Sequence, residues 1–329
     1  NLAIVMQCLG MRDLGVQMQA QALALQRIYP IAAARHPARL RLLLLMTAGD
    51  IAENTPIECL LEESDIELVF YFVDRNAPSL SSVPEHDVLM LAMADSQDNR
   101  GLFAFLVEAL QEWPKPVINA PQNIPATDRE RASQLLQNLP GLDMPPTLRG
   151  RRDQLQAVAA NPCVLGQLFP GLTFPLILRP VGSQAGRDLE KIEEPAQILH
   201  YLARVESADF FLSRFVDYRS SDGQFRKFRI ALIDGEPYVC HMAVSSSWMV
   251  HYVNAGMYED ARKREEEAGF MAQFDDFVRR HRPALQGIHQ RIRLDYFCID
   301  CAETLAGDLL VFEVDHVMVV HAMDPEDLF

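Results

Sequence analysis

The sequence DYFCIDCAETLAGDLLVFEVD, residues 295–315, decides the fold of this chain. Two apolar runs, Tyr296–Ala302 and Leu309–Val314, lie on either side of Ala306-Gly307-Asp308, which is typical of a turn. The pattern predicts two antiparallel strands joined as a hairpin. Because few polar side chains interrupt either strand, those that do are candidates for a functional site.

The polar side chains in this hairpin include three carboxylates. Asp300 lies in the first strand, whereas Glu313 and Asp315 lie in the second and face the same side, because side chains alternate along a strand. Asp300 can pair across the hairpin onto that side. Three carboxylates on an apolar face repel one another unless a cation lies among them. Since carboxylate oxygens are hard ligands, the trio predicts a site for Mg²⁺ or Mn²⁺, and the alternative is a solvated hairpin face.

A second group of candidate residues is basic and precedes the hairpin. Arg179 ends an apolar strand, and Lys227 and Arg229 share one face of a later strand. Cations near a loop of small residues and a carboxylate trio are typical of a metal–nucleotide site, because backbone N–H groups and cations hold phosphate oxygens. The alternative is ordinary surface charge. The small-residue loop follows Arg179 and consists of Gly182, Ser183, Gln184, Ala185 and Gly186.

Composition limits the class of protein. The chain has 329 residues, of which 49% are hydrophobic and 23% charged, so it can build a large core in more than one domain. Its net charge of −15 argues against a nucleic-acid partner. No apolar run reaches the roughly 18 residues of a membrane span. The 6 cysteines lie mostly in apolar runs, which predicts buried thiols and a reducing, cytoplasmic location. Because the sequence starts at Asn1, we expect it to be part of a longer chain.

The rest of the chain predicts several units in series. Apolar residues over Leu2–Tyr29 recur at three- and four-residue steps, which predicts a pair of helices within residues 1–36. Residues 37–140 alternate strands and helices, and the first strand, Leu40–Met46, is apolar on both faces. We therefore predict an open parallel α/β sheet there, with a last helix that follows Thr127 as its N-cap. The later segments are predicted to be α+β and comprise residues 141–208 and 209–329.

Two loops hold further candidates. Asp50, Glu53 and Asn54 follow the strand Leu40–Met46, and ligands of open α/β sheets bind outside the carboxyl ends of strands. These three residues are therefore candidates for substrate binding. The loop around His251 holds aromatic and polar residues and is a candidate for closing over a substrate beside the phosphates, although a packed crossover loop fits it equally well.

Along the chain, a strand that ends in a cation is followed by a glycine loop, a basic strand and an acidic hairpin. In this order the chain resembles the ATP-grasp superfamily, in particular the branch with glutathione synthetase and the RimK-type ligases. The resemblance is carried by PLILRPVGSQAG (175–186), FFLSRFVD (210–217) and Asp300 followed by Glu313-Val314-Asp315. It implies a pre-ATP-grasp domain at residues 37–140 and an ATP-grasp domain with lobes at 141–208 and 209–329. Residues 1–36 are similar to the end of the tetratricopeptide-repeat array that precedes such a module in some bacterial proteins.

The resemblance also implies an activity, namely ATP-dependent joining of a small-molecule or peptide carboxylate to an amine through an acylphosphate. Arg179 and Lys227 would bind phosphates, Arg229 would hold the γ-phosphate or the acylphosphate, and Asn254 would support phosphate or metal. A homodimer is expected, because dimers are common among relatives. The remaining implied sites are adenine at Ser213, Arg214, Phe215 and Val216, ribose at Asp217, phosphate at Gly182, Ser183, Gln184, Ala185 and Gly186, and Mg²⁺ at Asp300, Glu313 and Asp315.

The chain departs from the family at three places. Arg179 stands where the family usually has lysine, and its guanidinium still binds phosphate. Asp315 stands where asparagine is common, which adds negative charge. The usual Pro-Gly after that position is replaced by His316-Val317-Met318, and in relatives this turn borders the acceptor substrate, so the acceptor cannot be carried over. Two alternatives are a nucleotide-binding regulatory module without chemistry and a small-molecule kinase on the same fold.

Overall fold

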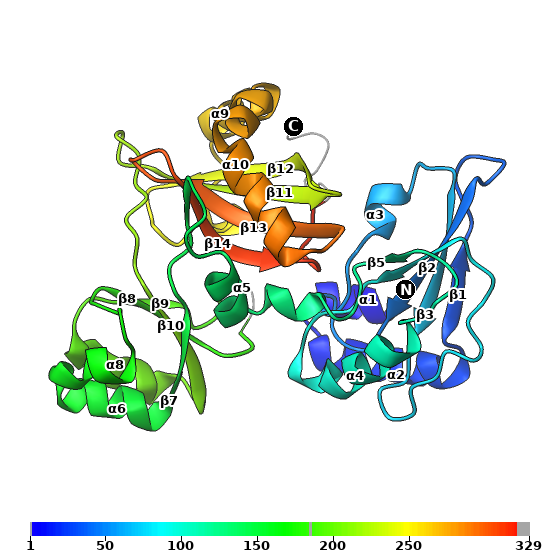
Figure 1. Ribbon diagram of the computed structural model, residues 1–329, viewed down its shortest axis with the longest axis horizontal. Coiled ribbons are helices and arrows are strands. Elements are labelled where there is room, and N and C mark those ends of the chain that lie inside the picture. Colours follow the sequence, from blue (N-terminus) through cyan, green and yellow to red (C-terminus); the bar gives the residue numbers. More distant parts are fainter. Residues whose placement is uncertain (1, 184–185, 321–329) are drawn as a thin grey trace.

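The computed structural model describes residues 2–183 and 186–320, and its strands form three sheets (Figure 1). The predicted helix pair at the amino end is confirmed as α1 (Leu2–Cys8) and α2 (Arg12–Leu25). The prediction that helix continues to Tyr29 is wrong. Residues 28–31 form strand β1 (Ile28–Ile31), because Pro30 has no N–H for a helix and the β-branched and aromatic neighbours favour an edge strand.

The first sheet is the predicted open α/β sheet, with strand order β1-β3-β2-β4-β5. β2 pairs in parallel with β3 and β4, and β4 pairs in parallel with β5, whereas β1 joins β3 antiparallel. Leu43, Leu44 and Leu45 are fully buried because both faces of β2 are covered. The elements are β2 (Leu40–Met46), α3 (Glu58–Leu61), β3 (Ile66–Phe72), β4 (Val88–Leu91), α4 (Arg100–Ala109) and β5 (Val117–Ile118).

The second sheet is antiparallel, with strand order β7-β10-β8-β9. Helices α6, α7 and α8 pack against it and share a separate hydrophobic core, which includes Val158, Leu178, Ile198 and Phe210. Figure 1 shows this lobe apart from the first sheet. Its elements are β7 (Leu148–Arg151), α6 (Arg152–Ala160), α7 (Leu165–Leu168), β8 (Leu176–Pro180), β9 (Glu190–Ile192), α8 (Pro195–Arg204) and β10 (Asp209–Arg214).

The third sheet, of order β12-β11-β13-β14-β6, contains the predicted hairpin as β13 and β14. Phe297 and Ile299 pack with α10 residues such as Ile288, whereas Ala231 and Cys298 pack against the first sheet. Two consecutive helices precede the hairpin in the chain. The elements are β6 (Leu142–Asp143), β11 (Phe225–Ile233), β12 (Glu236–Ser245), α9 (Ala261–Ala272), α10 (Phe274–Ile292), β13 (Tyr296–Glu303) and β14 (Leu309–Asp315).

Helix α5 (Arg129–Leu135) lies between the first and third sheets in the chain, and its predicted N-cap is wrong. Asp128, rather than Thr127, accepts hydrogen bonds from the backbone N–H groups of Glu130 and Arg131, because Thr127 already belongs to a 3₁₀ turn. No helix in the described part of the chain is long and apolar enough to cross a membrane. The domain boundaries given above remain predictions. The 3₁₀ turns are η1 (Gln97–Asn99), η2 (Ile124–Thr127), η3 (Pro162–Val164) and η4 (Tyr252–Asn254).

Candidate functional site

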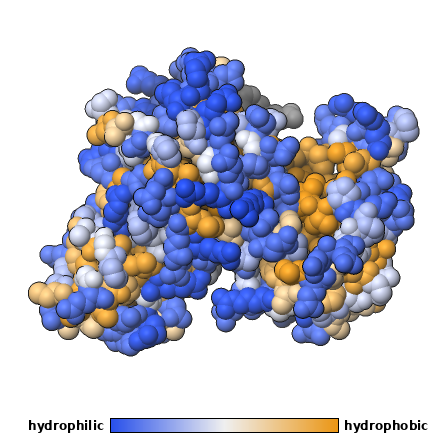
Figure 2. Space-filling model, in the orientation of Figure 1, coloured by the Kyte–Doolittle hydropathy of each residue, from blue (hydrophilic) through white to orange (hydrophobic). Residues whose placement is uncertain are grey.

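A continuous cleft of about 1160 Å³ is lined by residues of all three sheets. Single ligand sites commonly measure roughly 300–1,000 Å³, so this cleft has room for more than one ligand. Figure 2 shows the hollow between the first sheet and the part of the molecule that contains the third sheet, where hydrophobic residues gather. Most of the basic and acidic residues predicted as a functional site line the same cleft, including Arg179, Lys227, Arg229, Asp300, Glu313 and Asp315.

Asp300 is the centre of a buried ion-pair group. The register of β11 and β13 places Arg229 directly opposite Asp300. Arg229 donates from Nε to Oδ1 at 2.8 Å and from Nη2 to Oδ2 at 3.0 Å, and Lys227 Nζ donates to Oδ2 at 2.8 Å. Burial by itself would raise the pKa of Asp300, but the two cations outweigh it and hold that pKa far below its usual value. Asp300 is therefore ionised, and Lys227 and Arg229 balance its negative charge.

Glu313 has a cationic partner that sequence reasoning missed. Arg129, the first residue of α5, donates from Nη2 to Oε1 of Glu313. Burial would raise the pKa of Glu313, and the ion pair with Arg129 lowers it below its usual value. The sequence carried no signal for this contact, because 184 positions separate the two residues. A basic residue beside the N-cap of a helix is otherwise unremarkable.

Asp315 lacks such a partner in the described part of the chain. Burial, followed by repulsion from Glu313, raises the pKa of Asp315 to about 6. The Nδ1 atom of His316 lies 3.8 Å from Oδ1 of Asp315, but burial lowers the pKa of His316, so this imidazole is neutral at pH 7. Glu313 and Asp315 thus form a carboxylate pair with excess negative charge.

The donor set fits a divalent cation at Glu313 and Asp315. Two hard carboxylates that repel each other are suited to Mg²⁺ or Mn²⁺. Within residues 2–183 and 186–320, however, no three carboxylate, histidine or cysteine side chains converge as a metal-ligand group. Asp300 pairs with Lys227 and Arg229, so it would have to exchange these partners to become a third ligand. Its role as a metal ligand remains a prediction.

The pKa of Asp315 makes stability depend on pH, and we expect Asp315→Asn to stabilise the apo protein at pH 8 by about 1–3 kcal/mol. The carboxyl pKa is raised on folding, so the folded state binds the proton more tightly, and stability falls as pH rises from about 4 to about 6. Above pH 6 the carboxylate of Asp315 is ionised in the folded state, and the loss of folding stability is complete. Urea denaturation with a chelator at pH 4 and pH 8 measures the difference. Equal effects of the substitution at both pH values would contradict this account.

Arg179, on β8, is a buried cation without a carboxylate partner among the described residues. Only 8% of the residue is exposed. Its Nε donates to Oγ of Ser183 at 3.2 Å, and its Nη2 donates to the backbone carbonyl of Ser183. Burial and the nearby charge of Arg129 lower its pKa to about 10, so it remains protonated at pH 7. Two neighbouring cations in a cleft favour an anion between them.

Gly186, the last residue of the glycine loop, lies against His251 from the second half of the chain. Gly182 and Gly186 have φ values of +81° and +69°, which favour glycine. A Cβ on Gly186 would lie 2.4 Å from Nε2 of His251, so only a glycine lets this loop approach the imidazole. His251 itself lines the cleft. Gln184 and Ala185 lie outside the described residues.

We expect Gly186→Ala to lower the free energy of unfolding by more than Gly182→Ala does. Both substitutions place a side chain at positive φ, which costs roughly 1–2 kcal/mol, but a Cβ at Gly182 meets no atom within 4 Å. Only the alanine at position 186 also displaces His251. Urea denaturation of the two variants measures the difference, and His251→Ala in the Gly186→Ala background should remove it. Equal costs at both positions would exclude the contact.

The predicted adenine segment lines an apolar part of the cleft. Ser213 and Arg214 end β10, and Phe215 and Val216 follow. Arg214 donates from Nη2 to both carboxylate oxygens of Asp143 at 2.7 Å, which leaves the apolar side chains as the wall. The opposing and flanking residues that line the same part are Ile177, Leu189, Leu310, Val311 and Phe312.

Besides Gly182 and Ser183 of the glycine loop, two predicted site residues, Asp217 and Asn254, do not line the cleft. Asp217 is exposed, and its carboxylate pairs with Nη2 of Arg219 at 2.7 Å, so a ribose contact is not supported. Asn254 is also exposed, and its Oδ1 accepts the backbone N–H of His251 at 2.9 Å. Its amide therefore closes a turn, and the turn presents His251, rather than Asn254, to the cleft.

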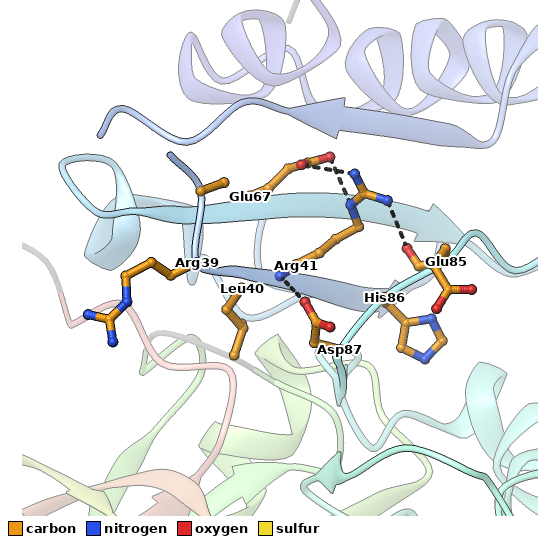
Figure 3. A pocket seen from close by; sticks show the side chains of 8 residues that line it. Arg39, Leu40, Arg41, Glu67, Glu85, His86 and Asp87 are labelled. Carbon is orange, nitrogen blue, oxygen red and sulfur yellow. Dashed lines mark hydrogen bonds and ion pairs between the residues drawn. The ribbon is translucent and has the colours of Figure 1, made fainter. Parts of the chain in front are cut away.

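The substrate candidates of the first sheet are divided by the fold. Asp50 and Asn54 line the cleft, whereas Glu53 accepts hydrogen bonds from Arg75, Ser96 and Asn99 and braces the loop. A smaller pocket lies at the other end of the strands (Figure 3). There the guanidinium of Arg41 pairs with Glu67, and Asp87 accepts the backbone N–H of Arg41. Because these groups already have partners, the larger cleft is the better candidate site.

Comparisons with known proteins give a fold. No family model and no curated protein matches the sequence. D-alanine–D-alanine ligase from Bacillus anthracis, solved with ATP, is 12% identical, with 84% of this chain and 86% of that chain covered and a TM-score of 0.50. VanG D-Ala:D-Ser ligase from Enterococcus faecalis is 12% identical (87% and 92% covered, TM-score 0.47). A RimK domain ATP-grasp protein from Sphaerobacter thermophilus DSM 20745 is 15% identical (85% and 92%, 0.46).

The likeness to the Bacillus anthracis ligase extends over most of both chains. At 12% identity it concerns the fold, and the roles of single residues remain predictions. The similarity of residues 1–36 to a tetratricopeptide array also remains a prediction. The predicted α/β and α+β architecture is confirmed, and the chain shares the fold of the Bacillus anthracis ligase.

Proposed function

We propose that this protein is an ATP-dependent ligase that joins a carboxylate to an amine through an acylphosphate. The observation that carries the proposal is the gathering of buried and half-buried cations and carboxylates in one cleft beside an apolar slot. The cations are Arg129, Arg179, Lys227 and Arg229. Such an arrangement suits a nucleotide whose base is apolar on its faces and whose phosphates are anionic.

In this proposal the adenine lies between Val216 and Leu310, and the phosphates extend toward Arg179 and Lys227. Gly186 lines the cleft, so its backbone N–H would be available to phosphate oxygens. Arg179 has no carboxylate partner in the part of the chain that the structure describes, so binding of a phosphate satisfies its charge. The contacts proposed for Arg179, Lys227 and Gly186 favour a polyphosphate over a neutral ligand.

The charges around Arg229 support the proposed chemical step. A substrate carboxylate oxygen attacks the γ-phosphorus and ADP leaves; an amine nitrogen then attacks the acyl carbon, inorganic phosphate leaves and the amine loses a proton. Arg229, two positions from Lys227 on β11, would orient the carboxylate and stabilise charge on the transferred phosphoryl group. Mg²⁺ held by Glu313 and Asp315 would neutralise phosphate oxygens.

Calorimetric titration of ATP with and without Mg²⁺ tests the nucleotide site. We expect binding that requires Mg²⁺ in the wild type and is lost in Glu313→Ala. Glu236→Ala is the matched control, because Glu236 is an exposed glutamate on the same sheet outside the cleft. A folded wild-type protein that does not bind ATP would reject the proposal.

Turnover separates a ligase from the alternatives. ADP release that requires both an acid and an amine supports the ligase. ADP release with a phosphorylated product and no amine would indicate a kinase, and ATP binding without turnover over a broad panel of acids and amines would indicate a regulatory module.

A further inference from the structure

We propose that one substrate of this ligase carries an extended apolar group, which binds at the end of the cleft remote from the nucleotide. The inference rests on the proposed function. We call this region the apolar end; its walls come from α2, the first sheet and the segment after β14. The residues that define it are Leu23, Tyr29, Met46, Phe70, Phe72 and Met318.

The walls of the apolar end are held in place by side chains from distant segments. The ring of Tyr29 on β1 meets the ring of Phe72 on β3 edge-on, with centroids 6.0 Å apart. Met46 ends the central strand β2 and is buried, whereas Phe70 and Phe72 are half-buried. Half-buried aromatic rings in a cleft leave apolar surface for a ligand to cover. Figure 2 shows hydrophobic residues gathered in the hollow beside this sheet.

Several polar groups at this end already have partners. Asn54 accepts the backbone N–H of Thr47 and donates to its carbonyl, both at 2.9 Å. Gln19 accepts the backbone N–H of Gly49 at 2.8 Å, and Asp50 pairs with Arg12 at 2.8 Å. These bonds hold the loop after β2. An occupant therefore gains most by covering apolar surface, so a hydrocarbon or aromatic group fits better than a charged one.

The apolar end is continuous with the reacting groups. Val317, Met318 and Val319 follow Asp315 after His316 and line the cleft. Arg229 Nη1 donates to the backbone carbonyl of Val319 at 2.8 Å, and Thr55 Oγ1 donates to the carbonyl of His316 at 2.9 Å. A substrate carboxylate held at Arg229 would lie beside this segment, so its carbon chain would have a path along Val317 and Met318 into the apolar end.

The test uses a matched series of ligands, N-acetyl-, N-butanoyl-, N-hexanoyl- and N-octanoylglycine, titrated calorimetrically with ADP and Mg²⁺ present. Each buried methylene should improve affinity by about four-fold until the apolar end is filled. A series whose affinity does not change with chain length, on protein that binds ADP, would overturn this inference and leave the proposed function standing. Protein that does not bind ADP but distinguishes the chain lengths would keep the apolar site and reject the ligase.

Two variants with matched controls locate the binding. Ala22→Glu introduces a charge on the cleft side of α2, and its control is Ala203→Glu on an exposed position of α8. Ile51→Asn is paired with Leu199→Asn, since both parent residues are 55% exposed and only Ile51 lines the cleft. We expect the two cleft variants to bind N-octanoylglycine at least five-fold more weakly than the wild type does. Their affinities for N-acetylglycine and for ADP should not change. Equal behaviour of variants and controls would overturn the assignment.

Discussion

Replacing Asp300 by alanine is expected to lower the free energy of unfolding by about 3–5 kcal/mol. Lys227 and Arg229 both pair with this carboxylate, and without it neither cation has an ion-pair partner in the described part of the chain. Removing one member of a buried ion-pair group leaves the desolvation cost of the others uncompensated. Urea denaturation at pH 7 measures the effect.

The pH dependence and a double variant provide the controls for Asp300→Ala. Because the folded pKa of Asp300 is lowered, its contribution is complete above the unfolded pKa of about 3.9 and is lost as pH falls further. The difference from wild type should therefore persist from pH 5 to 8 and shrink below pH 4. Adding Lys227→Met to Asp300→Ala removes one stranded cation and should recover part of the stability. A loss below about 1 kcal/mol at pH 7 would contradict a buried ion-pair group.

Arg179→Met is expected to weaken ATP binding about 10- to 100-fold, the range for losing a hydrogen bond to a charged group. The stability of the free protein should stay the same or rise, because the substitution removes a buried cation that has no carboxylate partner in the described chain. Calorimetry gives the affinity and urea denaturation gives the stability. A purely structural arginine would show the opposite pattern, with a lower stability and an unchanged affinity.

The matched control for Arg179→Met is Arg204→Met, which removes an exposed arginine of the same lobe that pairs with Glu190. It should leave ATP affinity unchanged. Arg179→Lys keeps the charge and loses the planar fork, so its affinity should lie between those of the wild type and the methionine variant. If Arg179→Met and Arg204→Met weakened ATP binding equally, the effect would come from net charge and not from the cleft.

Local patterns in the sequence were enough for most elements. The apolar runs at 40–46 and 296–302 became strands β2 and β13, because such runs bury both faces of a sheet wherever it packs. The three carboxylates do share one face, since Asp300 lies opposite Glu313 in the hairpin. Short-range geometry of this kind depends only on strand alternation. The predicted end of the first helical region was wrong, because pairing with β3 outweighed the helical periodicity at residues 28–31.

Most elements, the hairpin and the presence of both charge groups could thus be predicted from the sequence, because these depend on neighbours a few residues apart. Only the tertiary structure decided which charges meet. It paired Asp300 with Lys227 and Arg229 and brought Arg129 to Glu313. It also placed His251 instead of Asn254 in the cleft, and joined α2, β3 and the segment after Asp315 into the apolar end. Long-range ion pairs and packed walls depend on sheet register and packing, which no local pattern specifies.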